Sequence, residues 1–191
     1  MWLVLAEING MPKLMCMTRL NSLPLKKLIT IEPMHAFPII KDLVTDVSWN
    51  FRVKKGIMPS RRPDAPDGTW RMTQADVDRV QEFRKCIECF LYQDVCHVLR
   101  KHHLCDKYSG PRYYVHSAAL EMHPLDNENR IRQVRNTQGI GYCNVTHCCT
   151  KVCPAGILIT DNAIIPLKER VVDEFYDPLT RLFRSFRSAE T

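Results

Sequence analysis

The sequence predicts an α+β fold in which a short region of strands and turns is followed by a longer helical region. An Asn-Gly pair and several prolines separate strand-like runs in the first 50 residues, whereas helical spacing of apolar residues dominates after Thr73. Of the 191 residues, 45% are hydrophobic and 25% are charged, as in ordinary globular proteins. These proportions exclude a disordered or collagen-like chain, and the length allows one domain or two small ones.

Turn residues and local composition predict short strands in the N-terminal region. The pair Asn9-Gly10 is a strong signal for a two-residue hairpin turn, because both residue types tolerate the positive φ that this turn needs. Residues 13–20 and 28–32 are strand-like, with a proline between them. Residues 39–47 instead place apolar side chains at helical spacing, so we expect a helix there.

A change in composition separates this region from the helical one. Residues 54–72 contain prolines, glycines and clustered charges, which predicts a linker between a first domain at residues 1–53 and a second at residues 73–191. Thr73 and Asp76 have the spacing of a capping box, and the helix that they begin should end next to Cys86. We expect further helices at residues 89–103, 112–122, 163–173 and 179–186, the last with a basic face, and a solvated polar segment at residues 126–135.

The nine cysteines are the most informative feature of the sequence. Their number is odd and no export signal precedes them, which favours metal binding in a reducing compartment over disulfides. Most lie in two short runs, at residues 86–96 and 143–153. We expect Cys105 and Cys148 to be packed thiols, because adjacent residues such as Cys148 and Cys149 seldom face one site.

Two kinds of metal site are compatible with these runs. Zinc takes four ligands, often from two short cysteine pairs, and one pair from each run would supply them. Iron–sulfur proteins contain the run C-x2-C-x2-C-x3-C-P, which the first run matches except for Tyr92 at the third cysteine and His97 at the proline. Spacing favours iron–sulfur clusters, which use six cysteines, and zinc stays as the alternative. The six are Cys86, Cys89, Cys96, Cys143, Cys149 and Cys153.

The two cysteine runs, with Tyr-Ser-Gly-Pro-Arg at residues 108–112 between them, resemble the iron–sulfur subunit of the succinate dehydrogenase/fumarate reductase family, and in particular its actinobacterial branch. The resemblance covers about residues 7–180. It implies an N-terminal β-grasp domain like that of plant ferredoxins, followed by an all-helical ferredoxin domain. The segments that carry it besides the cysteine runs are residues 7–10, 14–19, 37–44 and 159–166.

The resemblance also implies a set of cluster ligands. Cys86, Cys89 and Cys153 match ligands of a [4Fe–4S] cluster, with Tyr92 at the position of the missing fourth ligand. Because tyrosine ligates few iron sites, we expect the Tyr92 ring to turn outward and pack. The ligands that match a [3Fe–4S] cluster are Cys96, Cys143 and Cys149.

The N-terminal domain departs from the family pattern. Cys16 alone matches the fourth ligand of the family's [2Fe–2S] cluster, and the other ligands would precede Met1. One thiol cannot hold a cluster, so the sequence predicts a truncated β-grasp remnant, with Cys16 on a strand and no [2Fe–2S] cluster.

The resemblance implies an electron-transfer subunit with no catalytic substrate site of its own. Its partners would be a flavoprotein (FAD) subunit and a membrane-anchor subunit that binds quinone. Neither the direction of catalysis nor the quinone type follows from the sequence. A structural module that holds zinc or a partial cluster, without electron transfer, is the alternative.

Charge and hydropathy bear on partners and location. The net charge of +6 permits a negative partner surface but does not require nucleic acid, and we expect none. The longest apolar run, residues 1–6, is too short to span a bilayer and makes a poor signal peptide. We therefore expect a peripheral protein on the cytoplasmic face of the inner (plasma) membrane.

Overall fold

A small antiparallel sheet forms the N-terminal end of the structure. The computed structural model describes residues 4–24, 26–65 and 67–178. Strands β1 (Leu5–Ile8) and β2 (Met11–Leu14) pair as a hairpin whose turn residues, Asn9 and Gly10, have φ values of 52° and 75°. The predicted hairpin is therefore confirmed. Strand β3 (Ile31–Glu32) pairs with the other edge of β1, which gives the order β2-β1-β3.

The remaining N-terminal elements differ from the prediction. Only the first part of residues 13–20 is a strand, because the Thr18 hydroxyl donates to the carbonyl of Leu14 at 2.8 Å and closes a local turn instead of a ladder. The two short 3-10 helices that follow are Met15–Met17 and Leu20–Ser22. Of residues 28–32, only the last two pair as a strand.

The helix predicted for residues 39–47 is wrong. These residues form a second hairpin from β4 (Ile39–Lys41) and β5 (Val44–Thr45), which turns at Asp42 with φ of 50°. The apolar side chains of this hairpin do not cover a core, since Ile40 is 66% exposed. Helical spacing without a buried face does not specify a helix, and the β-branched residues favour strands. The first helix comes later, as α1 (Ser48–Lys55).

The helical region begins with the predicted capping box. In α2 (Gln74–Gln81) the backbone N–H of Asp76 donates to the Thr73 hydroxyl, and the Asp76 carboxylate accepts from the backbone N–H of Thr73. A 3-10 turn, Glu82–Lys85, then delivers Cys86 at its end, as predicted. The prediction of one helix over residues 89–103 is wrong, because the backbone is extended at Cys96 and separates α3 (Leu91–Asp94) from α4 (His97–Arg100).

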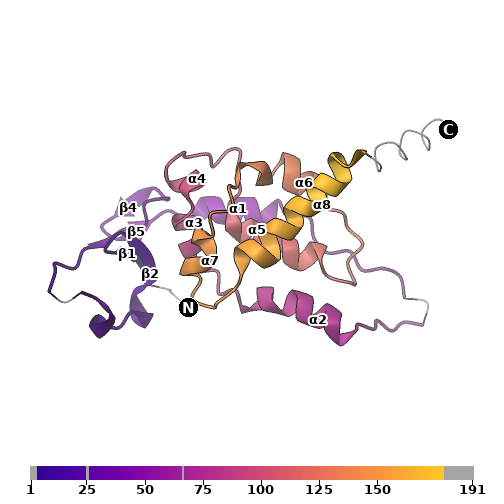
Figure 1. The fold of residues 1–191 in the computed structure, drawn as a ribbon, viewed down its shortest axis with the longest axis horizontal. Helices are drawn as coiled ribbons and strands as arrows, with labels where there is room; N and C mark the ends of the chain where they lie inside the picture. Colours follow the sequence, from indigo (N-terminus) through magenta and orange to yellow (C-terminus); the bar gives the residue numbers. More distant parts are fainter. Residues whose placement is uncertain (1–3, 25, 66, 179–191) are drawn as a thin grey trace.

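The C-terminal helices pack around one hydrophobic core. Helix α5 packs on the π-helical turn that leads into α8, and α8 also packs on α6 (Figure 1). Buried side chains such as Tyr114, Val134 and Leu167 fill the space between these elements. The elements are α5 (Pro111–Glu121), α6 (Ile131–Asn136), a 3-10 turn Ile140–Tyr142, α7 (Cys148–Val152), the π-helical turn Ile159–Ile164 and α8 (Ile165–Phe175).

Residues 126–135 are not the solvated segment that the sequence predicts. The Arg130 side chain is fully buried, and its guanidinium donates to the carbonyls of Met58 and Pro59 at 2.8 and 2.7 Å and to the Asp126 carboxylate at 2.9 Å. A basic residue in a polar run therefore anchors the long loop between α1 and α2 to the helical region. The sequence offers no local sign of this anchoring, because the carbonyls of Met58 and Pro59 are 72 and 71 positions away from Arg130.

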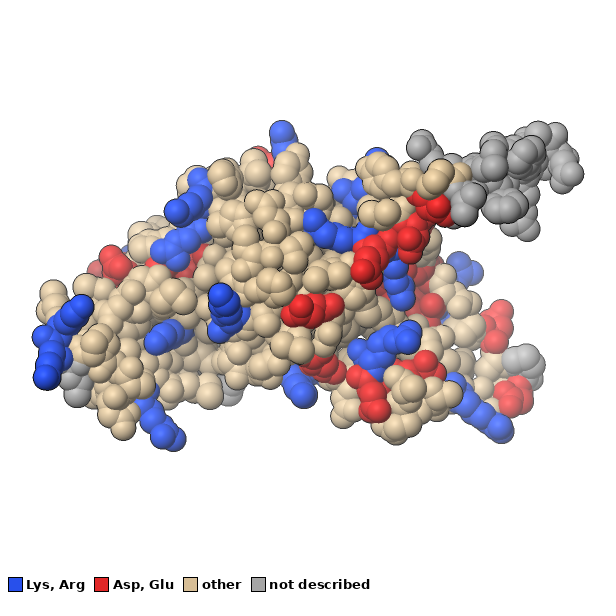
Figure 2. All heavy atoms as spheres, viewed as in Figure 1, with Lys and Arg blue, Asp and Glu red and all other residues tan. Residues whose placement is uncertain are grey.

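The predicted basic helix at residues 179–186 lies outside the described residues. Among the residues that are described, no helix is long and apolar enough to cross a bilayer. On the face shown in Figure 2, lysine and arginine side chains are spread along the molecule, whereas acidic side chains gather mainly over its helical end.

Candidate functional site: two groups of cysteines

All nine cysteines are free thiols, and the structure brings seven of them into two groups. The first group contains Cys86, Cys89 and Cys153. Cys86 ends the 3-10 turn after α2, Cys89 precedes α3, and Cys153 directly follows α7. Because α3 and α7 pack on each other, thiols from both cysteine runs meet here.

Electrostatics support this grouping. Burial raises the pKa of the Cys89 thiol to about 11, and the neighbouring Cys86 and Cys153 thiols raise it further in the same direction. Only thiols that lie close together act on one another in this way. The first group therefore concentrates three thiols around a buried Cys89, which is 1% exposed.

Tyr92 points into the first group. Its side chain is buried, and its hydroxyl oxygen lies 2.9 Å from the Cys86 sulfur. Burial, followed by the Cys86 thiol, raises the pKa of the phenol well above its ordinary value, so the ring carries its proton at neutral pH. The expectation that the Tyr92 ring turns outward is wrong. Helix α3 directs the ring inward, so that its hydroxyl lies beside the thiol of Cys86.

The second group contains Cys96, Cys143, Cys149 and Cys148. These four thiols line one narrow cavity of about 10 Å³ between α4, α7 and the turn after Ile140–Tyr142. Gly139 fixes the approach to Cys143: its φ is 65°, and a Cβ there would lie 1.9 Å from the Lys107 carbonyl oxygen. The side chains therefore face one shared space from separate segments of the chain.

Hydroxyl groups surround the second group, and sequence reasoning did not identify them. The Cys96 thiol donates to the Tyr108 hydroxyl at 3.8 Å, and Cys149 lies 3.4 Å from the Thr160 hydroxyl. Both hydroxyl-bearing side chains are buried. Hydrogen bonds to sulfur and exclusion of water are two of the properties by which a protein sets the potential of a cluster.

Cys148 departs from the expectation that adjacent cysteines do not face one site. It opens α7 after His147, whose φ of 57° turns the backbone so that Cys148 and Cys149 both line the cavity. The Thr146 hydroxyl donates to the Cys148 sulfur at 3.2 Å. Cys105, in contrast, is half-buried against the main core, as expected for a packed thiol.

Cys16 is not among the thiols of either group. It is exposed in the 3-10 helix after β2, rather than on a strand as predicted. The first 50 residues of the sequence contain no other cysteine. The thiols present there do not fit a [2Fe–2S] cluster.

The donor chemistry of the two groups fits iron–sulfur clusters. Across residues 4–178, apart from residues 25 and 66, no three Cys, His, Asp or Glu side chains are arranged to share one ion. In a cluster each thiolate binds its own iron, so the ligands surround a larger body. Soft thiolates without carboxylates are the ligands that such clusters use.

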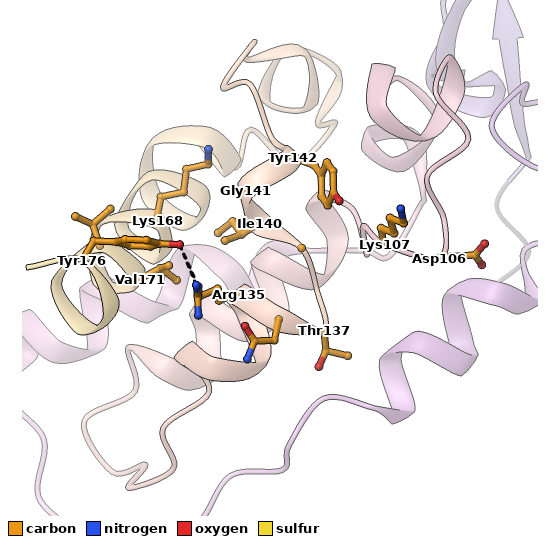
Figure 3. Close-up of a pocket in the computed structure, with 13 residues that line it drawn as sticks. Asp106, Lys107, Arg135, Thr137, Ile140, Gly141, Tyr142, Lys168, Val171 and Tyr176 are labelled. Carbon is orange, nitrogen blue, oxygen red and sulfur yellow. Dashed lines mark hydrogen bonds between the residues drawn. The ribbon is translucent and has the colours of Figure 1, made fainter.

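A larger pocket of about 720 Å³ lies beside the second group (Figure 3). Its walls include Arg135, which donates to the Tyr176 hydroxyl at 3.1 Å, and Lys168 on α8. The Lys168 ammonium donates to the Cys143 carbonyl at 2.6 Å. This bond ties the pocket wall to the backbone of a candidate ligand.

Comparison with known proteins adds three findings. Residues 5–52 match a family model described as a 2Fe-2S iron-sulfur cluster binding domain. The fumarate reductase iron-sulfur subunit of Mycobacterium tuberculosis is 31% identical over 156 residues, which cover 78% of this chain and 62% of that protein. The succinate dehydrogenase iron-sulfur subunit of Bacillus subtilis is 26% identical over 160 residues, which cover 80% of this chain and 61% of that protein.

The solved structures include a close match. A chain from the Mycobacterium smegmatis Sdh1 complex in the apo form superposes with a TM-score of 0.88 at 51% identity, covering 92% of this chain and 74% of that one. The chain thus spans about three fifths of the length of these two curated relatives.

Proposed function

The chain belongs to the iron–sulfur subunits of the succinate dehydrogenase/fumarate reductase family, and on this basis we propose that it carries electrons between a flavoprotein subunit and a quinone. The observation that supports this most directly is the meeting of thiols from two distant cysteine runs in two separate groups. Iron–sulfur cluster binding is the activity that such groups serve.

We assign one cluster to each group. Cys86, Cys89 and Cys153 would hold a [4Fe–4S] cluster with an irregular corner at Tyr92, and its phenol supplies an oxygen where a cysteine would supply a thiolate. Each cluster would draw ligands from both cysteine runs and so join the two parts of the helical region. The ligands of the second cluster, of the [3Fe–4S] type, would be Cys96, Cys143 and Cys149.

The clusters would supply one-electron chemistry, and the chain supplies their surroundings. Burial of Cys89, Cys96 and Cys149 excludes water from the sulfur atoms. The Tyr108 and Thr160 hydroxyls are placed to hydrogen-bond sulfur in the second group. Lys168 holds the backbone at Cys143 and so orients that thiol. These contacts favour fixed positions for the ligands, which limits the structural change on electron transfer.

The N-terminal region is proposed to be a β-grasp remnant within residues 1–53, joined by the loop of residues 54–72 to a helical ferredoxin domain at residues 73–191. It matches a [2Fe–2S] domain in sequence. Within these residues Cys16 is the single cysteine, and one thiol alone does not hold such a cluster.

The partners follow from the family. We propose a flavoprotein subunit, and a membrane-anchor subunit with its quinone, at the cytoplasmic face of the inner (plasma) membrane. The alternative is a structural module that holds zinc or a partial cluster, and the tyrosine at a ligand position is the observation in its favour.

A metal analysis combined with EPR separates these possibilities. The protein is isolated anaerobically with its partner subunits, and its iron, acid-labile sulfide and zinc are measured. Electron transfer predicts iron and sulfide in similar amounts, and EPR signals that change when succinate or fumarate is added. Zinc in place of iron, or clusters that do not respond to either compound, would contradict the proposal.

A further inference from the structure

A group of charged residues surrounds the loop that carries the first two cysteines. Glu88 lies between Cys86 and Cys89, with φ of 55°, and accepts from the Arg112 guanidinium at 2.6 Å. Lys54 from α1 pairs with the same carboxylate, and His116 from α5 lies 3.3 Å from it. The cysteine loop, α1 and α5 thus meet at one carboxylate.

Arg112 is fully buried at this point. Its guanidinium carbon lies 4.3 Å from the centre of the Phe90 ring and 5.6 Å from that of Phe51. Among the described residues, its Nε and Nη1 atoms have no hydrogen-bond partner. Burying unpaired donors of a charged group costs free energy. The ion pair with Glu88 and the contacts with the two aromatic rings act against this cost.

The charges of this group do not cancel. Lys54 and Arg112 are cations, whereas Glu88 is the one anion that pairs with them in the part of the chain that the structure describes. Burial and the charge of Lys54 lower the pKa of His116 to about 4, so His116 is neutral at pH 7. Lys54, Arg112 and Glu88 together carry one net positive charge. Of the two cations, Arg112 is the one that is fully buried.

This charge lies next to the first group of thiols. Arg112 bonds to Glu88, which stands between Cys86 and Cys89 in the chain, and its guanidinium packs on Phe90, the residue that follows Cys89. The backbone N–H of Arg112 donates to the Gln93 side chain at 3.1 Å, which fixes the start of α5 against α3.

We propose that Arg112 raises the reduction potential of the cluster held by Cys86, Cys89 and Cys153, and that Glu88 partly offsets this effect. The inference rests on the proposed function, because it requires a cluster at these thiols. Reduction adds one negative charge to a cluster, and a fixed positive charge nearby stabilises the reduced form, most strongly where water is excluded. Arg112 thus acts as a tuning residue.

The test uses the intact complex and four variants. Arg112→Gln removes the charge, Arg112→Lys keeps it, and Glu88→Gln removes the opposing charge. Arg170→Gln is the control, because Arg170 lies on α8 and bonds to Glu121 at the end of α5. Each variant is titrated with redox mediators while EPR reports the midpoint potential, and spin quantitation reports cluster content.

We expect a lower midpoint potential in Arg112→Gln, a higher one in Glu88→Gln, and values near the wild type in Arg112→Lys and Arg170→Gln. A merely structural role would move both charge variants in the same direction. Unchanged potentials at full cluster content would overturn the inference. If Arg112→Gln loses its cluster, Glu88→Gln decides, since an unchanged or lower potential there contradicts the idea.

Failure of the inference is distinct from failure of the proposed function. Wild-type protein without a cluster at these thiols would contradict the proposed function. Wild-type protein with the cluster, but with potentials insensitive to the signs of these two charges, would contradict only the role of Arg112.

Discussion

The hydroxyl oxygen of Tyr92 lies 2.9 Å from the sulfur of Cys86, inside the group of thiols that also contains Cys89 and Cys153. The phenol is buried and carries its proton at neutral pH. A site with three thiolates and one phenol holds its fourth iron weakly, because the neutral hydroxyl is a poorer ligand than a thiolate.

Tyr92→Cys should therefore raise the iron and sulfide content of the protein. The new thiol would complete the four-cysteine pattern and retain the fourth iron. Tyr92→Phe is the matched control, since it keeps the ring and removes the oxygen, and it should give no gain. Anaerobic reconstitution followed by iron and sulfide analysis measures both. Equal iron contents in Tyr92→Cys and the wild type would refute the irregular corner.

Cys143→Ser should abolish the EPR signal of the second cluster and leave that of the first. Cys143 joins Cys96 and Cys149 at one cavity, so its loss removes a ligand from that cavity alone. Cys105→Ser is the control, because Cys105 packs against the core and belongs to neither group. The assignment fails if Cys105→Ser has the same effect, or if Cys143→Ser keeps both signals.

The stability of the protein should decrease as the pH falls below about 6.5, partly because of His116. Its pKa is about 4 in the folded protein, compared with 6.5 in an unfolded chain, because of burial and the charge of Lys54. Between these values the unfolded chain binds a proton that the folded protein does not, so acid favours unfolding. This contribution is complete above about pH 6.5.

Thermal unfolding of His116→Gln at pH 7.5 and pH 5 measures the effect. On going to pH 5, the wild type should lose about 1–2 kcal/mol more unfolding free energy than the variant. An identical pH dependence in the two proteins would show that His116 titrates normally.

Arg130→Met should destabilise the protein by about 3–5 kcal/mol, because it breaks a buried pair and leaves the Asp126 carboxylate unpaired. It also removes the bonds to the carbonyls of Met58 and Pro59. Arg132→Met is the control, since Arg132 is exposed and its ion pair with Glu174 is long, at 3.9 Å. Thermal unfolding should show a large loss for the first variant and little for the second.

Local signals in the sequence predicted local structure. The hairpin at Asn9-Gly10 and the capping box at Thr73 depend on residues within three or four positions, and both are present. The helix predicted for residues 39–47 is wrong because spacing does not reveal whether a face is buried. The break in the helix at Cys96 was missed because local propensity does not predict it. The extended backbone there places the Cys96 thiol in the second group.

The sequence predicted which cysteines form the candidate site, but not which other side chains lie around them. Cysteine spacing and the family resemblance named six thiols, which the structure brings together in two groups. Cys148 and Cys149 line one cavity although they are adjacent, because the left-handed backbone at His147 turns the chain there. The roles of Arg112 and Lys54 were missed because 58 positions separate these two cations in the sequence, and the fold brings each of them to Glu88.

The central claim is that Cys149 and Cys153, four positions apart, ligate different clusters. EPR spectra of oxidised and reduced Cys149→Ser and Cys153→Ser in the intact complex test it most directly. The account predicts that Cys149→Ser loses the signal of the second cluster and keeps that of the first, and that Cys153→Ser does the reverse. Loss of the same signal in both variants would contradict it.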